Sequence, residues 1–212
     1  MDFAGIIETW RRVLTQPGEP VFLEEKNRPQ ATLQTALIWM LIAGVVAAIF
    51  GFLQSLTGVS SVDAMLDQAD LPPEVAAQMA PLLGAAVGGA GIAAIITVPV
   101  FFLIGSFIYH LLATMLGGQG DYGKFAYLMS TYQAPITIAS SIISIIPFLG
   151  GCVAFLLTIY AYVETYFAVR ANYGLSSGKA LAVVLIPIAL IFLLFLCLFA
   201  VLLGGLAMLN GN

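Results

Sequence analysis

The sequence predicts an all-α membrane protein with five transmembrane helices and an N-terminal amphipathic helix at the membrane interface. Of its 212 residues, 61% are hydrophobic and only 8% are charged, whereas a soluble domain is roughly 45–50% apolar and roughly 25% charged. Five apolar segments can cross a hydrocarbon core as helices. If each segment crosses once, all seven Lys and Arg residues lie on one side, as the positive-inside rule requires of the cytosolic side.

The first predicted element is an amphipathic helix over residues 2–15. Its apolar side chains recur at helical spacing, and its charged side chains take the opposite face. This stretch is too short and too charged to cross a membrane. An apolar face with Trp and a polar face with Arg suit the membrane interface, and packing on the protein's own cytosolic face is the alternative. The apolar face carries Phe3, Ile6, Ile7, Trp10, Val13 and Leu14, and the polar face carries Asp2, Glu8, Arg11 and Arg12.

The second of the five apolar segments is longer than one crossing needs. As a single helix, residues 81–116 would be roughly 54 Å long, against a hydrocarbon core of roughly 30 Å. Two short crossings would move Lys124, Arg170 and Lys179 to the outside, so one crossing is expected, with the N-terminus in the cytosol and the C-terminus outside. The predicted spans are residues 31–53, 81–116, 125–146, 152–169 and 180–208, in a membrane domain of residues 29–212 that follows a cytosolic segment of residues 1–28.

Small residues mark one face of the long second segment. Gly84 and Gly88 form a G-x-x-x-G pair, with Gly89 and Gly91 close by. Glycines at this spacing let two membrane helices approach closely. The Gly84/Gly88 face is therefore the expected contact in a homo-oligomer.

Residues 118–123 read GQGDYG, a literal G-x-G-x-x-G. In a dinucleotide-binding protein this motif follows a strand and opens a helix within a βαβ unit. Here one predicted membrane helix precedes it and another follows it, so we interpret it as a cytosolic turn. Gly117 and Gly118 are expected to end the preceding helix, and Asp121 is expected to cap the next one. The expected cytosolic loop carries Gly117, Gly118, Gly120, Asp121 and Tyr122.

The stretch IYHLLATMLGGQGDYGKFAYLMSTYQAP, residues 108–135, resembles the Yip1 domain family of small membrane proteins. The shared pattern is a His-containing apolar helix, then Gly-Gly-x-Gly with an aromatic residue, then a Tyr-and-Pro motif in the next helix. WRRVLTQPGEPVF near the start and YGLSSGKALAVVL before the last span resemble the family as well. The resemblance extends over nearly the whole chain.

The resemblance implies a five-helix membrane domain, and no cofactor is expected. Eukaryotic members act in vesicle trafficking and contact small GTPases of the Rab type, so membrane-protein or GTPase-type partners are implied. This chain has only about 30 residues before its first span and lacks the Asp-Leu-Tyr-Gly-Pro motif of the eukaryotic members. It is more similar to the short prokaryotic members, which implies the cytoplasmic membrane of a bacterium or archaeon.

Two ionisable side chains, His110 and Glu164, lie inside predicted spans. Such residues are rare and usually face the bundle interior or a wet cavity. Both are expected roughly 9–10 Å from the cytosolic ends of their helices. The third span starts from the same side, and its Gln133 lies eight residues after Phe125, at a similar depth. We therefore expect a polar layer of His110, Tyr132, Gln133 and Glu164, continued by a polar face of the third span with Ser130, Thr137, Ser141 and Ser144.

Three interpretations of this layer remain open at the sequence level. It is an internal hydrogen-bond network, a polar cavity that accepts a headgroup, ion or proton, or a set in which Glu164 reaches the interface alone or pairs with Arg170. No hydrolase, metalloprotease or P-loop motif and no nucleic-acid-binding basic run is present in the sequence. No metal site or enzymatic activity is expected. The sequence thus predicts a non-enzymatic membrane organiser or adaptor that presents a cytosolic rim to its partners, and a small transporter, channel or lipid-moving protein using the Glu164 layer is the alternative.

Overall fold

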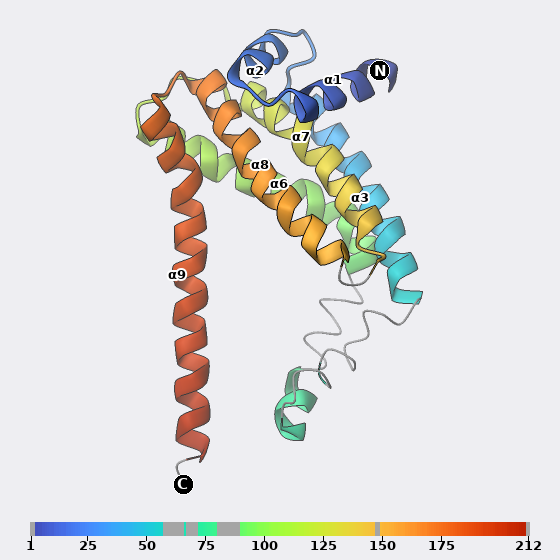
Figure 1. Cartoon of the computed structure of the whole chain (residues 1–212), viewed down its shortest axis with the longest axis vertical. Helices are drawn as coiled ribbons and strands as arrows, with labels where there is room; N and C mark the ends of the chain where they lie inside the picture. Colours follow the sequence, from blue (N-terminus) through green and yellow to red (C-terminus); the bar gives the residue numbers. More distant parts are fainter. Residues whose placement is uncertain (1–2, 57–65, 67–71, 80–89, 147–148, 211–212) are drawn as a thin grey trace.

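A computed structural model of the chain describes residues 3–56, 66, 72–79, 90–146 and 149–210. Every long element among them is an α-helix, and no strand occurs in these ranges. Figure 1 shows a bundle of long helices with two short helices across one end. The helices are α1 (Phe3–Thr15), α2 (Glu19–Lys26), α3 (Leu33–Leu56), α6 (Ala90–Met115), α7 (Tyr122–Ile143), α8 (Leu149–Tyr173) and α9 (Ser177–Asn210).

Helix α7 is the centre of the bundle. It packs against α1, α2, α3, α6 and α8, and residues 125–132 are buried without interruption. A helix enclosed by protein can carry hydroxyl groups that a lipid-facing helix would expose at a cost. This position accounts for the polar residues of α7.

Four of the five expected spans meet the length and hydropathy criteria for crossing a membrane. These are Leu33–Gln54, Ala93–Met115, Gly150–Tyr173 and Ser177–Val201. Among the described helices, α7 has the length for a crossing but does not meet these criteria. The membrane protein class is thus supported by four helices, and the fifth span stays a prediction.

Helix α8 extends beyond its predicted span at both ends. This helix starts three residues earlier and ends four residues later than the predicted 152–169. Helix α6 starts at Ala90, inside the predicted 81–116. Residues 80–89, with the Gly84/Gly88 pair, lie outside the described part of the chain. The proposed oligomer contact therefore stays a prediction.

Helix α1 lays its apolar face on the bundle. Val13 is fully buried, and Ile6 is 8% exposed. The rings of Trp10 and Trp39 meet edge to face at 5.8 Å between centroids. The structure therefore has the packing that the sequence left as the alternative to the membrane interface.

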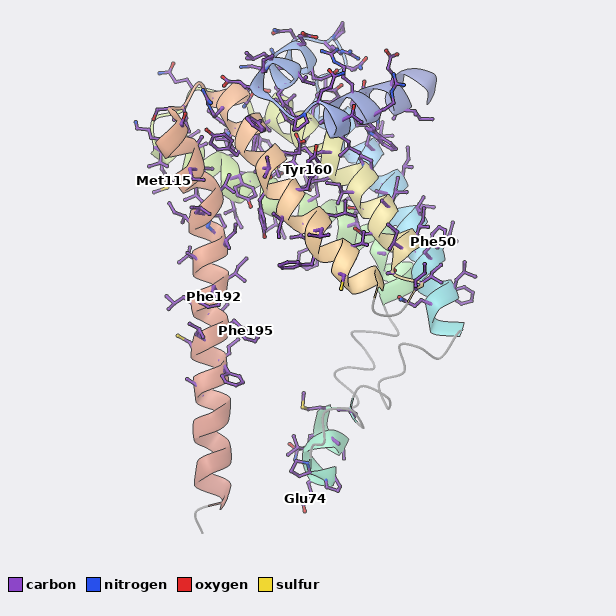
Figure 2. The ribbon with its side chains drawn as sticks, in the orientation of Figure 1. Phe50, Glu74, Met115, Tyr160, Phe192 and Phe195 are labelled. Atoms are coloured by element: carbon purple, nitrogen blue, oxygen red, sulfur yellow. The ribbon has the colours of Figure 1, made fainter. Side chains whose placement is uncertain are left out.

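Helix α9 leaves the bundle after its first turns. Its beginning packs against α6 and α8, whereas all side chains from residue 189 to 201 are exposed. In Figure 2, Phe192 and Phe195 lie on the part of α9 that extends away from the bundle. An apolar surface on all sides of a helix is typical of contact with lipid.

Candidate functional site

The turn between α6 and α7 ends one helix and starts the next, as predicted. Gly117 has a φ of 91°, a left-handed conformation that glycine adopts without strain. The N–H groups of Gly117 and Gly118 donate to the carbonyls of Thr114 and Ala113, both at 2.9 Å, which is a Schellman motif. Asp121 then accepts a hydrogen bond from the Lys124 N–H at 2.8 Å as the N-cap of α7.

The same turn is pressed against the end of α8. A Cβ atom on Gly118 would lie 2.7 Å from the Cβ of Tyr173, and one on Gly120 would lie 2.5 Å from the Nδ2 of Asn172. The Gln119 N–H donates to the carbonyl of Tyr173 at 3.3 Å. The Asn172 side chain donates to the carbonyl of Asp121 at 3.0 Å. The glycines of this G-x-G-x-x-G thus serve helix packing.

Basic side chains bind the exposed carbonyls at two helix ends. Lys26 donates to the carbonyls of Ala171 and Asn172 at the end of α8, at 3.2 and 3.0 Å. Lys179 donates to the carbonyl of Leu116 at the end of α6, at 2.9 Å. Cations are stabilising at helix C-termini because the last carbonyls carry partial negative charge. Burial, followed by repulsion from Lys124, lowers the pKa of Lys26.

These contacts place the ends of five segments in one layer. The layer contains α1, α2, the α6–α7 turn, the end of α8 and the start of α9, and an ion pair of 2.9 Å between Arg170 and Glu19 joins α8 to α2. We call it the basic layer because all seven Lys and Arg residues of the chain occur in it or in its adjoining turns. They are Arg11, Arg12, Lys26, Arg28, Lys124, Arg170 and Lys179.

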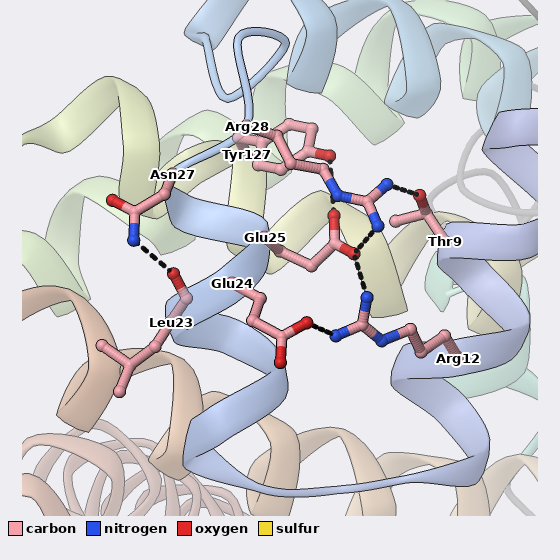
Figure 3. A network of polar contacts seen from close by, with 8 residues as sticks. All are labelled: Thr9, Arg12, Leu23, Glu24, Glu25, Asn27, Arg28 and Tyr127. Carbon is pink, nitrogen blue, oxygen red and sulfur yellow. Dashed lines mark hydrogen bonds and ion pairs between the residues drawn. The ribbon is translucent and has the colours of Figure 1, made fainter.

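A buried carboxylate, Glu25, fastens α1 and α2 to α7 (Figure 3). Its side chain is fully buried, 3.0 Å from the Nη2 of Arg28 and 3.9 Å from the Nη1 of Arg12. The hydroxyl of Tyr127 donates to Glu25 at 3.2 Å. Burial raises the pKa of Glu25, and Arg28 and Tyr127 oppose that shift.

The rest of the cluster extends from Glu25 to α1. Arg28 donates to the hydroxyl of Thr9 at 3.1 Å, and Arg12 also pairs with Glu24. Sequence reasoning missed both Glu25 and α2. The available signal was Pro20 after Glu19, a typical helix start, followed by Phe22 and Glu25 at helical spacing.

The structure does not bring the predicted polar layer together as one set. His110 bonds to Tyr173, with 2.6 Å between Nδ1 and the hydroxyl oxygen. Tyr173 lies nine residues after Glu164 on α8, which is roughly 13.5 Å along the helix. No contact joins His110 to Glu164 among the described residues. The reason is the extra length of α8, which brings Tyr173 to the level of His110.

Glu164 faces the protein interior, with no exposed surface. Neither carboxylate oxygen meets the geometric criteria of a hydrogen bond in the described part of the chain, although the hydroxyl of Tyr160 lies close by. The hydroxyl of Tyr160, one turn earlier on the same face of α8, donates instead to the carbonyl of Leu14 at 2.8 Å. A buried carboxyl without a donor is costly, so Glu164 needs an explanation beyond packing.

The polar face of α7 is only partly a network between helices. Tyr132 bonds to Thr165 of α8 at 2.7 Å, and the Gln54 amide donates to the carbonyl of Ser144 at 2.7 Å. The serine hydroxyls return to their own helix: Ser130 to Tyr127, Ser141 to Thr137 and Ser144 to Ser141. Gln133 and Thr137 instead line two cavities, one between α3, α6 and α7 and one between α6, α7 and α8.

Several apolar helices of membrane-spanning length, joined by a basic layer at one end, define a multi-pass membrane protein of the all-helical class. The model of the Yip1 domain family matches residues 11–199, which is most of the chain. The chain belongs to the Yip1 domain family. No curated protein and no solved structure matches it.

Proposed function

We propose that this chain is a non-enzymatic membrane organiser that crosses the bilayer five times and presents its basic layer to the cytosol. The observation that supports this best is the construction of the layer. Three side chains of α2 bind the helices below it: Glu25 binds Tyr127 of α7, and Lys26 and Glu19 bind Asn172 and Arg170 of α8. The outer surface of α1 and α2 is therefore fixed in position. A fixed, partly charged platform loses little conformational freedom when a partner binds.

The outer surface of this platform has the composition of a binding face. Ile7 is 62% exposed and Leu23 is 41% exposed, and Glu8 and Arg11 beside Ile7 in the sequence are exposed as well. Large apolar side chains in a charged setting are typical of sites that contact another protein or a membrane surface. By family resemblance, the partner is a membrane protein or a GTPase-type protein.

Affinity capture can test the organiser role. We would tag the full chain, solubilise it in mild detergent and compare the captured proteins of the wild type with those of Ile7→Glu and Arg11→Glu. Both changes lie outside the buried contacts, so the fold should be kept. Loss of a captured protein in these variants, with retention in the control Gln16→Ala, supports the proposal. The same captured set in all four proteins would overturn it.

The exposed Ile7 of α1 also allows this helix to contact the lipid headgroup region with its outer face. The measurement is Trp10 fluorescence with depth-dependent quenchers in the variant Trp39→Phe. Quenching by groups in the lipid headgroup region would support contact with the interface. Protection from both lipid and aqueous quenchers would leave Trp10 buried against the bundle alone.

The alternative function, proton or ion movement, is favoured by Glu164. A fully buried carboxyl with both oxygens unpartnered is a typical feature of intramembrane proton-binding sites. Flux of protons or cations into vesicles containing the wild type and Glu164→Gln tests this. Flux in the wild type that is lost in Glu164→Gln would support transport, and equal leak in both proteins would exclude it.

A further inference from the structure

Two neighbouring hollows near α8 differ in polarity: most side chains that line the first are polar, and most that line the second are apolar. The first is a cavity of about 320 Å³ between α6, α7 and α8. The second is a groove of about 550 Å³ between α8 and α9. Both volumes fall within the roughly 300–1,000 Å³ typical of sites for small molecules. Tyr162 lines both of them, so the cavity and the groove adjoin at this residue.

Hydroxyl and amide groups from three helices line the cavity, and none of them is charged. Thr158 and Thr165 already bond to carbonyls of their own helix at 2.8 and 2.7 Å. Among the described residues, the side chains of Tyr109, Thr137 and Tyr162 have no hydrogen-bond partner. The polar lining consists of Tyr109, Gln133, Thr137, Thr158, Tyr162 and Thr165.

The groove is apolar along nearly its whole length. Its branched side chains come from two helices that diverge beyond this point, since α9 leaves the bundle. A hydrocarbon chain fits such a surface because the only hydroxyl-bearing residues that line the groove are Tyr162, Tyr166 and Ser177, so few polar groups would be buried. Its apolar lining includes Ile159, Val163, Leu181, Val184, Leu185 and Ile188.

From this pairing we propose that the chain binds one amphipathic lipid with an uncharged, hydroxyl-bearing head. The head occupies the cavity, where Tyr109, Gln133 and Tyr162 supply hydrogen bonds. The tail lies in the groove between α8 and α9. The site is distinct from Glu164, which does not line either hollow.

Depth excludes a phosphate head in this cavity. Thr165 and Thr158 lie five and twelve residues before Arg170, which places the cavity roughly 8–18 Å along α8 from the basic layer. A phosphate at that depth would lose its water without gaining a cationic partner, because no Lys or Arg lines the cavity. A neutral head with one or two hydroxyls loses much less and regains hydrogen bonds.

The test uses a photoactivatable, alkyne-tagged diacylglycerol as the probe. The full chain is reconstituted into phosphatidylcholine vesicles with a minor fraction of the probe, irradiated and mapped by peptide mass spectrometry. Labelling should concentrate on residues 159–166 and 181–188. Unlabelled dioleoylglycerol should displace the probe, and dioleoyl phosphatidic acid, with the same tails and a charged head, should not.

Two variants remove polar groups from the cavity with little change of volume. Gln133→Leu and Tyr162→Phe should each lower labelling by about five- to tenfold, the size expected for one lost hydrogen bond. Ser141→Ala is the matched control on α7, since Ser141 bonds to its own helix outside the cavity. Labelling in this control should equal that of the wild type.

Three results would overturn the proposal. Labelling spread evenly over all lipid-facing helices, including residues 190–201 of α9, would show ordinary contact with bulk lipid. Displacement by phosphatidic acid as strong as by dioleoylglycerol would show that the site does not select an uncharged head. If unlabelled dioleoylglycerol does not displace the probe from the wild type, the protein has no specific site for this lipid. This outcome does not depend on whether the variants fold.

Discussion

The glycines of the α6–α7 turn are required by neighbouring atoms more than by the turn itself. Only Gly117 has the left-handed conformation that favours glycine. Gly118 and Gly120 have no room for a side chain, because Asn172 and Tyr173 at the end of α8 occupy the space. The turn therefore fixes the distance between the end of α6 and the end of α8.

We expect Gly120→Ala to lower the free energy of unfolding by about 1–3 kcal/mol, because overpacking of a tight contact has this cost. The added Cβ would lie 2.7 Å from the backbone carbonyl oxygen of Asn172, which cannot rotate away. Denaturant titration in detergent micelles measures the change. Gly105→Ala is the control, since no atom lies within 4 Å of its Cβ. Equal stability of the two variants would contradict the packing argument.

A second feature at this scale is the buried charge of Glu25. Its pKa is raised from 4.5 by burial in spite of Arg28 and Tyr127. The folded protein therefore binds the Glu25 proton more tightly than the unfolded chain does. The stability that arises from this shift is complete below pH 4.5 and is lost as the pH rises through the raised pKa.

We therefore expect the wild type to lose stability relative to Glu25→Gln as the pH rises from below 4.5 to neutral. The neutral amide does not titrate, so the variant provides the reference at each pH. Unfolding in micelles at a series of pH values gives the difference in free energy. A difference that grows with pH in favour of the wild type would show that Arg28 outweighs burial.

At the scale of the element, two lysine side chains donate hydrogen bonds to carbonyls at the C-terminal ends of other helices. Lys179 is in the first turn of α9 and binds the last carbonyl after α6. Lys26 ends α2 and binds the last carbonyls of α8. Each lysine therefore joins two helices and stabilises the partial charge at the end of one of them.

Lys179→Met should loosen the last turn of α6 without unfolding the bundle. The expected loss is about 0.3–1 kcal/mol, as for an exposed cation at a helix C-terminus. Hydrogen exchange followed by mass spectrometry should show faster exchange at residues 113–118. Lys124→Met is the control, because Lys124 lies at the start of α7 and has no hydrogen bond to α6. Faster exchange in both variants would indicate a general effect of lost charge.

Local signals in the sequence were sufficient for the long helices, for α1 and for several helix ends, whereas the short helix α2 was missed. The glycine end of α6 and the Asp121 cap of α7 depend on residues within a few positions, so they could be predicted. The bond between His110 and Tyr173 joins residues 63 positions apart, and it depends on how far α8 extends beyond the apolar segment. The cavity at Tyr162 depends on the rotation of three helices, which hydropathy does not specify.

At the scale of the whole molecule, positive charge is confined to one end: all seven Lys and Arg residues lie in the basic layer or its adjoining turns. The long helices all start or finish at the basic layer, and the distal part of α9 lies at the opposite end of the molecule (Figure 1). Between the two ends, α7 is enclosed by its neighbours. An enclosed helix can cross the membrane with fewer apolar residues than its neighbours need, which supports the fifth crossing.

We expect Lys26, Lys124 and Ser177 to be cytosolic, and residues near Asp67 and Asn212 to be on the outside. Single cysteines at these positions, in a background of Cys152→Ala and Cys197→Ala, can be labelled with a membrane-impermeant maleimide. In intact cells only the two outer positions should react. Reaction of Lys124→Cys before permeabilisation would contradict five crossings.

The contacts of the basic layer also impose an order in time. Tyr160 bonds to Leu14 and Lys26 bonds to Asn172, each across 146 residues of chain, and Glu25 meets Tyr127 across 102. A ribosome that adds roughly 5–20 residues per second needs roughly 7–30 s to synthesise 146 residues. During that interval α1 and α2 have left the ribosome, and their partners on α8 do not yet exist. The first helices to be synthesised consequently form their bonds to α8 only late in synthesis.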